Sequence, residues 1–97
     1  MDENQLPPVQ IPITGELDLH TFRPAEVSDL LDDYFDQCVS RGIYSVRIIH
    51  GKGTGALKKR VRTILDRHPL VKTYTDAPAD AGGWGATCVA LARKPKT

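Results

Sequence analysis

Residues 46–62 read VRIIHGKGTGALKKRVR and place a strand, a glycine-rich turn and a helix next to one another. Residues 46–49 are typical of a buried strand, and residues 56–62 are typical of a basic helix. Glycines allow the backbone between them to approach an anion closely, and the free N–H groups at the start of a helix favour negative charge. The stretch therefore predicts an anion-binding turn.

The turn differs from the two common phosphate-binding loops. The P-loop pattern G-x-x-x-x-G-K-[ST] has its lysine after the second glycine, whereas Lys52 precedes Gly53 here. The residues also differ from the dinucleotide-binding fingerprint. Taken alone, these residues fit an ordinary strand-to-helix turn as well as an anion-binding turn. The remainder of the chain is needed to distinguish the two interpretations.

Length and composition indicate the class of protein. A chain of 97 residues predicts one domain, which buries roughly two thirds of its unfolded surface. We find no signal peptide and no apolar run near the ~18 residues of a membrane span, so we expect a cytoplasmic protein without membrane contact. Cys38 and Cys88 lie in apolar segments without metal-ligand spacing, which favours two reduced, buried thiols over a disulfide.

Charge and proline content divide the chain. Residues 1–36 carry nine acidic residues and one basic residue (−8), and residues 37–97 carry three acidic and twelve basic residues (+9). The basic part could therefore meet a polyanion, although a solvated helix face explains the charge equally well. Residues 1–13 contain three prolines and little periodicity, which predicts an extended arm before a domain at residues 14–97.

A short strand follows the Thr14-Gly15 turn and spans Glu16–His20. Side chains alternate across a strand, so Leu17 and Leu19 share one face while Asp18 and His20 share the other. We therefore expect two reactive groups side by side at the carboxyl end of this strand.

Two segments show the periodicity of amphipathic helices. The first begins at Pro24, ends before Gly42 and buries Val27, Leu30, Leu31, Tyr34, Cys38 and Val39. Its other face carries Glu26, Asp29, Asp32, Asp33 and Asp36, which favours a solvated surface over a metal-binding cluster. The second ends before Pro69 and buries Leu57, Val61, Ile64 and Leu65. His68 in its last turn suits the helix dipole and predicts a structural histidine.

Residues 70–75 and 86–92 predict two further strands, joined by a glycine-rich loop that is long for a hairpin. The resulting order, βαβαββ, predicts a two-layer α/β sandwich of two helices on a four-stranded mixed sheet. A right-handed crossover makes the first two strands parallel, which brings Asp18 and His20 alongside residues 50–55. Open α/β sheets bind ligands at such carboxyl ends of strands.

Three motifs of the chain resemble those of the Smr (small MutS-related) domain family. They are LDLH at residues 17–20, HGKGTG at residues 50–55 and GGWGAT at residues 82–87, in the family's order and spacing, and the resemblance covers about residues 11–94. It implies a fold similar to the C-terminal domain of translation initiation factor three. It also implies endonuclease activity on RNA or DNA, because known members act as endonucleases. These members are domains of mismatch-repair-related proteins, domains of ribosome-rescue nucleases, or standalone proteins. Thr21 stands where the family commonly has glycine. This difference bears on the substrate preference more than on membership in the family.

The resemblance and the chemistry of the side chains give a candidate site. Phosphodiester cleavage needs a base, an acid and positive charge on the phosphoryl oxygens. The candidate catalytic residues are His20 as a base, with Asp18 either orienting it or acting on a neighbouring group, and His50 as an acid or a phosphate ligand. The candidate nucleic-acid-binding residues are Gly51, Lys52, Gly53, Thr54, Gly55, Lys58, Lys59, Arg62, Gly83, Trp84, Gly85 and Thr87. We assign no metal ligand. Cleavage of RNA through its 2′-hydroxyl requires no cofactor. Cleavage of DNA needs an activated water, for which a divalent metal is possible.

Other interpretations of these residues stay open. Asp18 and His20 could only tie off a strand end, and Trp84 could either stack on a base or cover the core. The function is then either a monomeric endonuclease of low sequence specificity or a nucleic-acid- or ribosome-binding module without chemistry.

Overall fold

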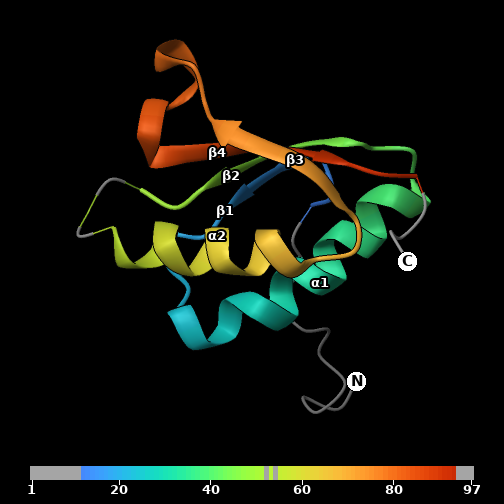
Figure 1. Cartoon of the computed structure of the whole chain (residues 1–97), viewed down its shortest axis with the longest axis horizontal. Helices are drawn as coiled ribbons and strands as arrows, with labels where there is room; N and C mark the ends of the chain where they lie inside the picture. The colour runs from blue at the N-terminus through green and yellow to red at the C-terminus, as the bar shows by residue number, and fades with distance from the viewer. Residues whose placement is uncertain (1–11, 52, 54, 94–97) are drawn as a thin grey trace, which may run out of the picture.

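The computed structural model describes residues 12–51, 53 and 55–93 (Figure 1). Its elements are β1 (Glu16–Asp18), α1 (Pro24–Ser40), β2 (Ser45–Ile49), α2 (Ala56–Arg67), β3 (Val71–Asp76), the short 3₁₀ turns η2 (Ala79–Ala81) and η3 (Gly83–Gly85), and β4 (Ala86–Leu91). The sheet has the order β1-β2-β4-β3, in which β1 and β2 are parallel and the other neighbours antiparallel. Both helices lie on the same side of the sheet (Figure 1), which confirms the predicted two-layer α/β sandwich.

The apolar stripe of each helix packs on one face of the sheet. Leu17 of β1 and Ile48 of β2 are buried together with Leu31 of α1 and Val61 of α2. Full burial of such a side chain stabilises the fold by about 1.5–3 kcal/mol, so this shared core fixes both helices on the sheet. Phe35 is fully buried as well, although the predicted stripe of α1 did not include it.

The acidic face of α1 is exposed to solvent, as predicted. The helix begins at Pro24, where the N–H of Arg23 donates to the carboxylate of Glu26 at 2.8 Å. Over the described residues, no three histidine, cysteine or acidic side chains lie close enough together to hold a metal ion. In that same part of the chain, neither helix is long and apolar enough to cross a membrane.

Some boundaries differ from those predicted. β1 ends at Asp18 rather than His20; beyond it the N–H of Leu19 still donates to the carbonyl of Ile49 at 2.7 Å, while the N–H of His20 donates to the Asp18 carboxylate at 3.0 Å. Both cysteines are free, but only Cys38 is buried, and Cys88 is half-buried. The predicted N-terminal arm falls largely on residues 1–11, outside the described residues.

Gly15 connects the start of β1 to two neighbouring elements. Its N–H donates to the hydroxyl of Tyr34 on α1 at 3.1 Å, and its carbonyl accepts the N–H of Arg47 on β2 at 2.7 Å. Its φ is +92°, and a Cβ added here would lie 3.0 Å from the carbonyl oxygen of Ser45. The turn therefore needs glycine both for its backbone conformation and for the space beside it.

We predict that Gly15→Ala destabilises the domain more than Gly42→Ala does. Both glycines have positive φ, which costs an alanine about 1–2 kcal/mol, but a Cβ at Gly42 would meet nothing within 4 Å. The free energy of unfolding from urea denaturation measures the difference. Equal losses in the two variants would show that the close approach to Ser45 does not constrain the turn.

Candidate active site and nucleic-acid interface

The carboxyl end of β1 holds the pair of reactive groups predicted from the sequence. Asp18 and His20 lie on the side away from the core, with 49% and 64% of their side chains exposed. The Asp18 carboxylate accepts the backbone N–H of His20 at 3.0 Å and contacts ring atom Nδ1 at 2.5 Å. These hydrogen bonds, the backbone one first, hold the pKa of Asp18 below its usual value. Asp18 is therefore a carboxylate that orients the imidazole.

The contact with Asp18 determines which nitrogen of His20 is free. An ionised carboxylate only accepts hydrogen bonds, so Nδ1 carries the proton when the ring is neutral. Nε2 then carries the lone pair and has no hydrogen-bond partner among the described residues. His20 thus has the arrangement of a general base held in one tautomer by a carboxylate.

His50, directly after β2, is in a different environment, since only 5% of it is exposed. Its Nδ1 donates to the carbonyl of Gly51 at 3.1 Å, which leaves Nε2 to accept the Thr87 hydroxyl at 2.8 Å. Burial lowers the pKa of His50, which favours the neutral ring. Both nitrogens are bound within the protein, so the geometry favours a supporting role for His50 over the predicted role of acid or phosphate ligand.

The second and third motifs are also joined through the backbone. The carbonyl of Gly85 accepts the N–H of His50 at 3.1 Å and that of Gly51 at 2.9 Å. Gly85 and Thr87 are buried, so in this structure they cannot make the direct nucleic-acid contacts that the sequence predicted for them. These two residues instead support the glycine turn through their hydrogen bonds to His50 and Gly51. No signal in the sequence separated these buried residues of the motif from its exposed ones.

A cavity of about 280 Å³ lies where the ends of β1 and β2 meet the start of α2. Its lining includes His20, His50, Gly51, Gly53, Gly55 and Lys58. The expectation that the first two motifs face one site is therefore confirmed. Gly55 is the N-cap of α2 and has a φ of +84°, a left-handed turn that carries the chain into the helix. The predicted contacts of Lys52 and Thr54 lie outside the described residues.

Lys58 and Arg62 extend this site along one face of α2, because they are one helical turn apart. The Nζ of Lys58 lies 3.0 Å from Oδ1 of Asp76 and 5.1 Å from the centre of the Trp84 ring. Trp84 is 45% exposed, so it is not a cover over the core. Lys59 is exposed and forms no ion pair within the described part of the chain.

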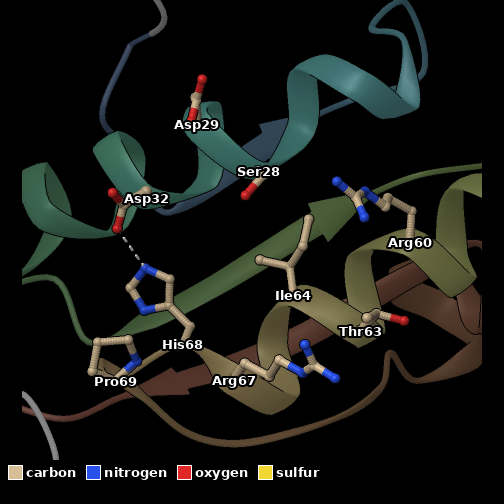
Figure 2. A pocket seen from close by; sticks show the side chains of 9 residues that line it. All are labelled: Ser28, Asp29, Asp32, Arg60, Thr63, Ile64, Arg67, His68 and Pro69. Atoms are coloured by element: carbon tan, nitrogen blue, oxygen red, sulfur yellow. Dashed lines mark hydrogen bonds and ion pairs between the residues drawn. The ribbon is translucent and has the colours of Figure 1, made fainter.

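A second, larger groove of about 310 Å³ lies between the two helices (Figure 2). Acidic side chains of α1 and basic side chains of α2 line it, with His68 at one end (Figure 2). The Nε2 of His68 donates to Asp32 at 3.0 Å, and its Nδ1 accepts the N–H of Leu70 at 3.1 Å. His68 is thus a buried histidine at the C-cap of α2, as predicted, and this groove contains none of the three motifs.

We predict that His50→Gln makes the stability of the domain less sensitive to acid. The native ring resists protonation, whereas the unfolded ring takes up a proton near its usual pKa of 6.5, so stability falls as the pH drops below that value. Unfolding free energies at about pH 7.5 and about pH 5.5 measure the loss in each protein. A variant that loses as much stability on acidification as the unmodified chain would contradict the buried, neutral state of His50.

Comparison with known proteins places these motifs in one family. The Smr domain model matches residues 17–92. The endonuclease MutS2 of Halalkalibacterium halodurans is 49% identical over 79 residues, which are 81% of this chain and 10% of that protein. The endonuclease MutS2 of Thermomicrobium roseum is 39% identical over 89 residues, 88% of this chain and 11% of that protein. This chain therefore spans about a tenth of the length of these relatives.

Two solved structures agree. The Smr domain of Thermus thermophilus MutS2 superposes with a TM-score of 0.77 at 38% identity, over 81% of this chain and 99% of that one. YdaL, a stand-alone small MutS-related protein from Escherichia coli, superposes with a TM-score of 0.75 at 28% identity, over 86% of this chain and 68% of that one. The chain belongs to the Smr domain family.

Proposed function

We propose that this chain is an endonuclease that cleaves phosphodiester bonds in RNA or DNA with low sequence specificity. The observation that carries the proposal is the exposed Asp18–His20 pair, in which His20 keeps a free Nε2 and lines a cavity shared with the glycine turn. The MutS2 relatives are named endonucleases, which supports the same class of reaction.

His20 is the proposed general base, and Asp18 is the residue that positions it. All three histidines of the chain are described, and the rings of His50 and His68 use both nitrogens within the protein. The Nε2 of His20 is therefore the imidazole nitrogen available to take a proton from a nucleophile. Asp18 keeps the proton of the neutral ring on Nδ1 and stabilises the imidazolium that forms.

RNA is the simpler substrate for this arrangement. His20 would take the proton of the 2′-hydroxyl, the 2′-oxygen would attack phosphorus, and the 5′-oxygen would leave and be protonated by water. Lys58 and Arg62 would stabilise the charge that develops on the phosphoryl oxygens. The products are a 2′,3′-cyclic phosphate and a free 5′-hydroxyl. On DNA the same base would act on a water molecule.

We predict that His20→Ala and Asp18→Asn each lower the rate of RNA cleavage while binding is retained. Loss of a general base costs about 10²–10⁴-fold in rate, and the loss of the orienting carboxylate should be smaller than that. Both side chains are exposed, so the fold should remain intact. Cleavage of a labelled single-stranded RNA, with chelator present, gives the rate and the end groups of the products.

RNA with 2′-O-methyl groups provides the substrate control, because it removes the nucleophile without changing the backbone charge. Full cleavage of this RNA would contradict the 2′-hydroxyl route, and full cleavage by His20→Ala would contradict the assignment of the base. Binding without cleavage by the unmodified protein, on RNA and DNA alike, would favour the nucleic-acid- or ribosome-binding module.

We predict that the double variant Lys58→Ala and Arg62→Ala binds nucleic acid with a weaker dependence on salt. Each phosphate contact to a single strand contributes about −0.7 to the slope of log affinity against log salt concentration. The matched control is Arg60→Ala with Arg67→Ala, which removes two cations of α2 that line the other groove (Figure 2). Fluorescence anisotropy of a labelled oligonucleotide over a range of salt gives the slopes. Equal slopes for the two double variants would rule out this face of α2 as the phosphate contact.

A further inference from the structure

Asp76 connects the two cations of the proposed interface. It ends β3, and its Oδ1 forms ion pairs with Lys58 and with Nη2 of Arg62. In the sheet Asp76 pairs with Thr87, the residue whose hydroxyl binds His50. The carboxylate therefore lies next to the proposed active site, between the two side chains expected to hold a phosphate.

Aromatic rings lie against the same two cations. Lys58 lies over Trp84, and the guanidinium of Arg62 lies 5.5 Å from the centre of the Tyr74 ring. The Nε of Arg62 is buried and has no hydrogen-bond partner among the described residues. The guanidinium thus contacts Asp76 through Nη2 and leaves part of its donor set unused. A phosphate in place of Asp76 would offer the Nζ of Lys58 and the end of the guanidinium more acceptor oxygens than one shared Oδ1 does.

We propose that Asp76 stands in for a backbone phosphate of a nucleic acid strand, and that the strand displaces it from Lys58 and Arg62 on binding. This inference rests on the proposed function, because it assumes that the site binds nucleic acid. Asp76 holds the two cations in position in the free protein. It also competes with the phosphate for them, and this competition weakens the binding of the strand. The amino-acid sequence alone places Asp76 only in a loop or at a strand end.

The energies permit such an exchange. Asp76 is the most exposed of the three charged side chains, with 49% accessible against 36% for Arg62 and 17% for Lys58, so water reaches the carboxylate and screens both ion pairs. A polyanion gains affinity from the counterions that it releases, which an internal carboxylate does not. The hydrogen bond from Lys58 and the nearby charge of Arg62 lower the pKa of Asp76, so its carboxylate stays ionised and competes with phosphate throughout the neutral range.

The test compares Asp76→Asn with Asp80→Asn. Asp80 lies in η2, is exposed and forms no ion pair in the described part of the chain, so its variant makes the same change in net charge elsewhere. Labelled single-stranded RNA and DNA oligonucleotides, titrated into each protein with chelator present, give the affinities. We expect Asp76→Asn to bind both up to about fivefold more tightly, and Asp80→Asn to bind less than about twofold more tightly.

The fluorescence of Trp84 gives a second readout, because Trp84 is the one tryptophan of the chain. Lys58 lies over its ring in the free protein, so we expect Asp76→Asn to change the emission before any oligonucleotide is added. Asp76→Ser serves as a second variant and should act in the same direction, since it also removes the charge.

The outcomes separate this inference from the proposed function. Unchanged or weaker binding by Asp76→Asn and Asp76→Ser, with the unmodified protein binding normally, would overturn the inference and leave the proposed function standing. Equal gains for the Asp76 and Asp80 variants would also overturn it, because net charge alone would explain them. Absence of binding by every protein, on RNA and DNA, would overturn both.

Discussion

The parallel pairing of β1 with β2 is the constraint on which the rest of the site depends. It continues beyond the end of β1, where the N–H of Leu19 donates to the carbonyl of Ile49 at 2.7 Å. This bond fixes the point at which the two chains leave the sheet, and so sets His20 beside the glycine turn. An antiparallel pair would have placed the two ends at opposite edges of the sheet.

The two histidines of the candidate site differ in burial and in hydrogen bonding. His20 is exposed and keeps one nitrogen free, whereas His50 is buried and uses both. A buried imidazole that bonds to Thr87 and Gly51 stabilises the position of the turn between β2 and α2. In the proposed endonuclease this turn would hold a phosphate beside His20, and a general base works only within hydrogen-bond distance of its proton.

The sequence predicted the fold and the site to different extents. Periodicity predicted both helices and all four strands, because alternation and helical spacing follow directly from burial on one face. The contact of His50 with Thr87 joins residues far apart in the chain, and spacing does not indicate which motif residues face inward. Asp76 was missed for the same reason, since its partners Lys58 and Arg62 come from another element. The end of β1 was predicted two residues late, because alternation of side chains continues through His20 whereas the Asp18 side chain binds the N–H of His20 in a local turn.

The protonation of the histidine rings tests the central claim most directly, because that claim is that His20 presents a free Nε2. Long-range ¹H–¹⁵N correlation spectra of the full chain, recorded at alkaline pH, distinguish the two tautomers of each ring. The account predicts protonated Nδ1 in His20 and His50, and protonated Nε2 in His68. A His20 ring protonated on Nε2, or an equal mixture of its tautomers, would contradict the account.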